Sequence, residues 1–178
     1  MQVYEAAVRS AINEELKKEW EKYRTETTRH VEIVTGLIEH FGGDLEASSP
    51  GRTVVRQIGQ SLVKAMNLAH KAGGSPEAAQ LVAAECVVEA ETKDHLNWEL
   101  LSEAARALKG EDATIVKEAL SEVEEQEDEH LYHSTGWCRE LWIESLGLPA
   151  VLPPPEEEKD VKTAIGAAHA KRARRELL

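Results

Sequence analysis

Apolar residues recur at steps of three and four along most of this chain, a spacing that places them on one face of an α-helix. Clusters of glycine, proline and serine separate these periodic segments and indicate loops. The pattern predicts an all-α fold with helices near residues 2–9, 13–41, 53–71, 76–108, 113–146 and 156–177. Residues 1–148 should form a helical bundle, and residues 149–178 a proline-rich spacer followed by a tail helix.

The first residues allow two interpretations. Ser10 or Asn13 can act as an N-cap, which would end a short first helix and begin the long second one. The alternative is a single unbroken helix over residues 2–41. We expect the break, and therefore a shortened first helix.

One acidic residue occupies a position where a carboxylate is not expected. At about 100° per residue, apolar residues such as Val123 and Leu131 fall within about 40° of Glu127. A buried ionised carboxylate is costly unless it is paired or binds a metal. His130 follows one turn later, and Glu-x-x-His pointing into a helical core is the ligand pattern of di-iron and di-manganese bundles. The alternative is a glutamate-rich solvated helix face that contains a histidine.

Polar residues are also expected at the same height on the neighbouring helix. The last two long helices meet at a glycine-containing turn and should run antiparallel. Counting back from this turn places Asp94 level with Glu127 and Glu91 level with His130. Asn97 lies near the centre of the core face of the same helix. We therefore predict that Asp94 belongs to a metal site, and that Glu91 and Asn97 are weaker candidates.

Further candidates lie elsewhere on the long helices. Glu26 and His30 are one turn apart on the same side of the second long helix. A histidine at the edge of an apolar stripe is more often an ordinary core residue. The Glu-x-x-His pair at Glu127 and His130 nevertheless favours interpreting Glu26 and His30 as ligands. Glu124, His95 and His133 lie off the core axis and are weaker candidates.

Composition limits the kinds of partner and the cellular compartment that we expect for this chain. The formal net charge of −12 disfavours nucleic acid or an anionic membrane as the main partner. The sequence has no run of about 18 apolar residues, so no membrane span is expected, and its first residues lack the apolar stretch of a signal peptide. Cys86 and Cys138 fall on apolar helix faces and are expected to be reduced core residues, which favours the cytoplasm.

Three segments carry a resemblance to a known superfamily. In this order and spacing, TETTRHVEIVTGLIEHFGG, KDHLNW and EEQEDEHLYHSTGW resemble the ferritin-like proteins, most closely the YciF-like stress proteins and more distantly rubrerythrin. The resemblance covers about residues 13–146. It implies an antiparallel four-helix bundle, usually dimeric, with an iron or manganese pair between the helices. It also implies ferroxidase-type or peroxide-type chemistry suited to a stress response.

Carried over residue by residue, the resemblance implies ligands at Glu26, His30, Asp94, Asn97, Glu127 and His130. The chain departs from the family pattern in three respects. Glu26 and His30 are four residues apart where three is usual, and Asn97 is an amide where the family has an acid. If the break is a hairpin, a ligand on the first helix at the height of Glu26 would lie about 15 residues before the break. That position would precede Met1. A second interpretation therefore stays open: a structural or interaction bundle that has lost the metal site.

The shortened first helix also bears on assembly. It is too short to cover three long helices whose apolar stripes run over about 30 residues, and monomers rarely leave such a surface exposed. We expect a homodimer or larger oligomer in which a second copy covers this groove. The tail helix is expected to dock on the bundle or on the neighbouring subunit.

Overall fold

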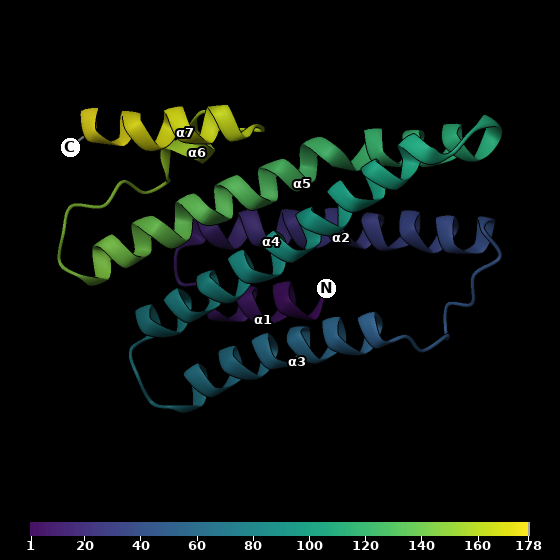
Figure 1. Ribbon diagram of the computed structural model, residues 1–178. Coiled ribbons are helices and arrows are strands. Elements are labelled where there is room, and N and C mark those ends of the chain that lie inside the picture. The colour runs from purple at the N-terminus through teal and green to yellow at the C-terminus, as the bar shows by residue number, and fades with distance from the viewer. Residues whose placement is uncertain (178) are drawn as a thin grey trace.

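The computed structural model describes residues 1–177, and every regular element in this range is helical, which confirms the all-α prediction. Long helices lie alongside one another, and short helices lie near both ends of the chain (Figure 1). The elements are α1 (Gln2–Ser10), α2 (Glu14–His40), α3 (Pro50–Lys71), α4 (Pro76–Ala107), α5 (Gly110–Ser145), α6 (Pro155–Glu158), α7 (Ala164–Ala173) and the 3₁₀ helix η1 (Arg174–Glu176). Within residues 1–177, no helix has both the length and the apolar character needed to cross a membrane.

The predicted break between the first two helices is present. The Asn13 side chain accepts hydrogen bonds from the backbone N–H groups of Glu15 and Leu16, at 2.9 and 3.1 Å, and so caps α2. The Gln80 side-chain oxygen accepts from the N–H groups of Ile12 and Asn13, each at 2.8 Å. These contacts satisfy the backbone donors that a break leaves free.

Two predicted boundaries differ from the structure. Helix α3 begins at Pro50, three residues before the predicted start, because the Ser49 hydroxyl accepts a hydrogen bond from the Arg52 N–H at 3.1 Å. The predicted tail helix over residues 156–177 is interrupted. Asp160 adopts a positive φ of 47°, and Thr163 caps α7 through the Gly166 N–H at 3.0 Å. The tail therefore consists of separate short helices.

The core lies where α1 to α5 meet. Helices α4 and α5 pack along much of their lengths, and α1 contacts α2, α3 and α4. Large side chains that are almost completely buried fill this space, among them Tyr4, Leu16, Trp20, Tyr23, Met66, Val87 and Trp137. The first half of the stripe predicted on the long second helix is thus buried as expected.

The second half of that stripe is exposed, contrary to the core position predicted for it. Met1 lies level with Thr28, whose hydroxyl is 3.2 Å from the Met1 Sδ, so α1 covers only the first half of α2. Beyond this point Val31 is 52% exposed and Phe41 50% exposed. We call this surface the open face, and its residues are Val31, Val34, Ile38 and Phe41 of α2 with Leu101 of α4.

The tail packs against α5. The Arg139 guanidinium donates two hydrogen bonds to the Glu156 carboxylate, at 2.7 and 2.8 Å, and Arg174 Nε donates to Glu140 at 2.7 Å. A Cβ at Gly136 would lie 2.7 Å from Glu156 Oε2 and 3.0 Å from Pro154 Cβ, so glycine favours the close approach of the tail to the helix. The tail is therefore docked on the bundle, as predicted, and does not form the cover of the open face.

Candidate metal centre

Titratable side chains from three helices meet in the interior of the bundle. The group comprises four carboxylates and two imidazoles: Glu26 and His30 from α2, Glu91 and Asp94 from α4, and Glu127 and His130 from α5. All six were singled out from the sequence, Glu91 as a weaker candidate. We call this group the carboxylate–histidine cluster.

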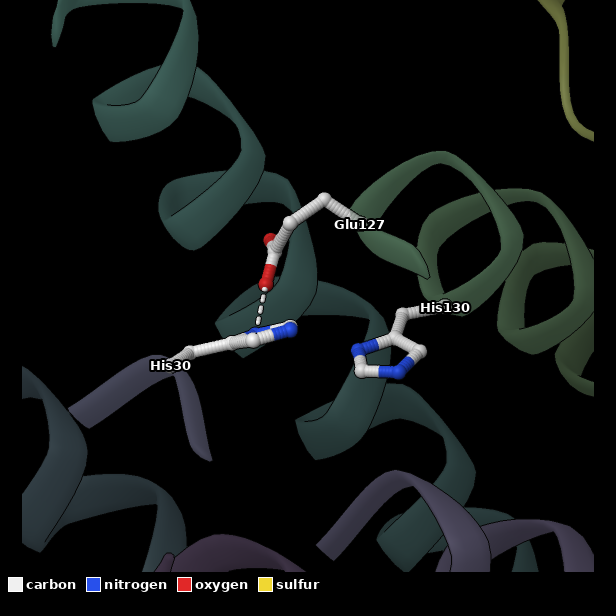
Figure 2. Close-up of side chains that lie close together, drawn as sticks. All are labelled: His30, Glu127 and His130. Carbon is white, nitrogen blue, oxygen red and sulfur yellow. Dashed lines mark ion pairs between the residues drawn. The ribbon is translucent and has the colours of Figure 1, made fainter. Parts of the chain in front are cut away.

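Three members of the cluster lie close enough to share one metal ion. One ligand atom each from His30, Glu127 and His130 lies within 4.8 Å of the others, and the three side chains are 3%, 2% and 0% exposed. Figure 2 shows Glu127 reaching from α5 toward the His30 ring, with the His130 ring beside it. Glu127 therefore points into the protein, as its position on the apolar stripe predicted.

His30 and Glu127 form a buried ion pair whose geometry is poor for a hydrogen bond. His30 Nδ1 and Glu127 Oε1 are 2.8 Å apart, yet neither atom has a hydrogen-bond partner among the described residues. The other ring nitrogen of His30 lies 2.7 Å from the Gln126 side-chain oxygen, which suits a protonated Nε2. In neutral His30 the Nδ1 lone pair then faces a carboxylate, so a bound cation or an additional proton is needed between them.

His130 lies between carboxylates from two helices. Its Nε2 is 2.8 Å from Glu26 Oε2, and its Nδ1 is 3.4 Å from Glu91 Oε2. The predicted pairing of Glu91 with His130 across the hairpin is thus present. Burial lowers the pKa of His130, but the Glu26 and Glu91 carboxylates outweigh burial and raise that pKa to about 9.

The cluster contains more negative charge than its own residues neutralise. Burial, and then the Glu127 and Glu91 carboxylates, raise the pKa of Asp94 to about 7. Five buried atoms have no hydrogen bond among the described residues. Four of them face each other as ion pairs, His30 Nδ1 with Glu127 Oε1 and His130 Nδ1 with Glu91 Oε2, whereas Glu127 Oε2 has neither kind of partner. Buried polar atoms are rarely left without partners, and a divalent cation would satisfy oxygens and nitrogens of this kind together.

Two tyrosines that sequence reasoning did not propose for the site border the cluster. Tyr4 of the short α1 packs its ring 6.3 Å from the His130 ring, and the Tyr23 ring lies 4.1 Å from it. Burial raises the pKa of Tyr4 well above its ordinary value, and Glu91 raises it further. The expectation that a first-helix residue at this level would precede Met1 is therefore wrong, since Met1 already reaches Thr28, beyond Glu26. The first helix presents a phenol here and no carboxylate.

Apart from Glu91, the weaker candidates lie outside the cluster. Asn97 is exposed, not central to the core as predicted, because the pocket between α2 and α4 leaves this part of α4 uncovered. Glu124 is exposed at a second pocket, between α4 and α5. His95 Nε2 lies 2.7 Å from Asp128, so it pairs with a carboxylate outside the cluster.

His133 belongs to a second group with Glu19 and Glu129, whose ligand atoms also lie within 4.8 Å of one another. Here the protein supplies most of the partners itself. The Tyr23 hydroxyl donates to Glu19 and lies 3.1 Å from His133 Nδ1, and Lys22 pairs with Glu129. Burial raises the pKa of Glu19, but hydrogen bonds from His133 and Tyr23 outweigh burial and lower that pKa. The carboxylate–histidine cluster is therefore the stronger metal candidate.

No family model, curated protein or solved structure matches this chain. The fold and the site define its class directly: a helical protein with buried histidine and glutamate groups that could hold a metal ion.

The protonation of the cluster predicts how the metal-free protein responds to pH. The folded-state pKa of Asp94, about 7, and that of His130, about 9, exceed the ordinary values of 3.8 and 6.5. Groups whose pKa is raised by folding stabilise the protein at low pH, and this contribution is lost as pH rises through the folded-state pKa. We expect the free energy of unfolding to fall from about pH 4 to pH 9, first through Asp94 and then through His130. Denaturant titrations in chelator should show this fall, and a flat or rising profile would contradict it.

Proposed function

We propose that this chain is a ferritin-like four-helix-bundle protein that binds iron or manganese in the carboxylate–histidine cluster. The observation that carries the proposal is the set of buried oxygen and nitrogen atoms without hydrogen bonds around Glu127, His30 and His130, whose ligand atoms lie within 4.8 Å of one another. Carboxylate and imidazole ligands suit these two metals. Four carboxylates and two imidazoles also match the number of ligands that dinuclear carboxylate bundles use.

In this proposal His30 and His130 would each supply a nitrogen, and Glu26, Glu91, Asp94 and Glu127 would supply oxygens. A bound iron or manganese pair would supply electrons to O₂ or peroxide, chemistry suited to a stress role. Gln126 would orient His30 through its contact with Nε2, so that Nδ1 is free to bind. Tyr4 and Tyr23 would exclude water from the α1 side of the site.

The free thiols of Cys86 and Cys138 suit the reducing cytoplasm, where we place the protein.

The second candidate function is a structural or interaction bundle without metal. Its support is that Glu26 lies 2.8 Å from His130, so protonated imidazoles can neutralise part of the cluster. The phenol of Tyr4, where the resemblance implied a carboxylate, also favours this candidate. The two candidates differ in one measurable property, the binding of metal to the folded protein.

Metal content and stability together test the proposal. The full chain, produced without an affinity tag, should contain iron or manganese when analysed by mass spectrometry of the elements. After chelation, adding Fe²⁺ anaerobically or Mn²⁺ at about 100 times the dissociation constant should stabilise the fold by about 2.7 kcal/mol. Protein that carries neither metal, and whose melting temperature neither ion shifts, would support the structural bundle instead.

We also propose that the protein assembles as a homodimer in which a second copy covers the open face. Residues 53–58 of α3 are all exposed, and Val54, Val55 and Ile58 among them are apolar. Helix α3 carries Arg52 and Arg56 but no acidic residue, whereas residues 31–41 carry Glu32 and Glu39 but no lysine or arginine. The exposed half of α3 in one copy therefore complements the open face of another in both apolarity and charge.

A further inference from the structure

A pocket on the surface between α4 and α5 leads to the carboxylate–histidine cluster. Its volume is about 640 Å³, and Glu127 forms part of its wall. Glu127 is only 2% exposed, and both of its carboxylate oxygens lack a hydrogen-bond partner among the described residues. The pocket thus joins the solvent to a buried carboxylate that has unused binding capacity.

The wall of this pocket is strongly acidic. Besides Glu127, its carboxylates come from Glu99, Glu103, Glu124 and Asp128. The described basic residues in the wall are Arg106, which pairs with Glu103 at 2.6 Å, and His95, whose Nε2 lies 2.7 Å from Asp128. With His95 neutral, five carboxylates and one guanidinium give a formal charge of −4. We call this the acidic pocket.

The opposite side of α4 has a different character. The pocket between α2 and α4, of about 390 Å³, also touches the cluster, through His30 and Asp94. Its remaining wall includes Val31, Val34 and Leu101, and Asp94 is its one carboxylate among the described residues. A cation that approaches the cluster meets strong attraction on the α5 side and a largely apolar surface on the α2 side.

We propose that the acidic pocket is the path by which divalent metal ions reach the cluster, with Glu127 as the carboxylate that receives them. This inference rests on the proposed metal binding and adds a route to it. Clefts lined by charge of one sign concentrate counter-ions and raise association rates by about 10-fold to 1,000-fold, and salt weakens the effect. Glu124 and Glu99 act at the mouth, where their side chains are exposed, and Glu127 acts at the inner end.

The test is the rate at which the metal-free full chain takes up Co²⁺, followed by stopped-flow absorption of the bound ion. In the test variant Glu99→Gln and Glu124→Gln are combined. The matched control combines Glu21→Gln and Glu46→Gln, which remove two exposed carboxylates outside the pocket. At low ionic strength the test variant should load about 10-fold more slowly than wild type. The control should load at nearly the wild-type rate, and added salt should reduce the difference.

The amount of Co²⁺ bound at the end separates the possible outcomes. The same final Co²⁺ per chain in wild type and test variant, reached more slowly in the variant, supports the path. Equal rates in the two proteins, or a lower final amount in the test variant, overturn the path and leave the metal centre in place. If wild type binds no Co²⁺, both the metal centre and the path are wrong.

Discussion

Glu127→Gln is expected to abolish binding of iron or manganese, because it removes the charge from the carboxylate that three observations connect to the site. Glu127 contacts His30 at 2.8 Å, shares a possible metal position with His130, and is almost completely buried. Glutamine keeps the size of the side chain, so packing should be preserved. His130→Ala should weaken binding without abolishing it, since the carboxylates and His30 would still contact the ion.

The same substitution should have the opposite effect on the metal-free protein. In the absence of a cation, Glu127 is a buried carboxylate that faces His30 and lies near Asp94, and the charges of Glu127 and Asp94 repel each other. Removing one partner of a buried ion pair usually costs stability, but His30 can release its proton when residue 127 is neutral, so no charge is left unpaired and the repulsion from Asp94 is removed. We expect metal-free Glu127→Gln to be as stable as metal-free wild type or about 1 kcal/mol more stable.

Glu125→Gln provides the matched control, because Glu125 is exposed two residues away on the same helix. Metal content and melting temperature, each measured with and without chelator, should match wild type for this control. Unchanged metal content in Glu127→Gln would exclude Glu127 as a ligand. A large loss of metal-free stability in Glu127→Gln would indicate that the carboxylate serves the fold and would favour the structural bundle.

The parts of the site that could be predicted depend on regular helix geometry. The apolar period identified Glu127 as an inward carboxylate, and counting across a tight turn paired Glu91 with His130, which the structure places 3.4 Å apart. Helical rise and rotation are fixed by the backbone, so such counting stays accurate over several turns. Asn97 was misplaced because the period shows which face is apolar but not how much of that face another helix covers.

The parts that could not be predicted depend on contacts between distant segments. Tyr4 shares a helix face with Ala7, which is also buried, but nothing in the pattern indicated that its ring would reach His130. The interruption of the tail depends on Asp160 adopting a positive φ and on Thr163 capping the next helix. The close approach at Gly136 likewise requires Glu156, twenty residues later in the sequence.

Ile38→Asp should convert the proposed homodimer into a monomer. Ile38 lies on the open face, where no described segment of the same chain covers it, and it is 36% exposed. In the proposed dimer it would be buried against the exposed half of α3 from the second copy, and an unpaired carboxylate is strongly disfavoured in such an interface. Ile58→Asp on α3 should have the same effect, because it changes the other side of the same contact.

Light scattering after size-exclusion chromatography at micromolar concentration measures this outcome directly. The control is Ile165→Asp, which introduces the same change at a residue of α7 that is 72% exposed and lies outside the open face. Wild type and Ile165→Asp should be dimers, whereas Ile38→Asp and Ile58→Asp should be monomers with unchanged helical circular dichroism. A monomeric wild type would contradict the dimer. A dimeric Ile38→Asp would show that the two copies meet at another surface. The open face would then be exposed to water without a partner, which is unusual for an apolar surface of this kind.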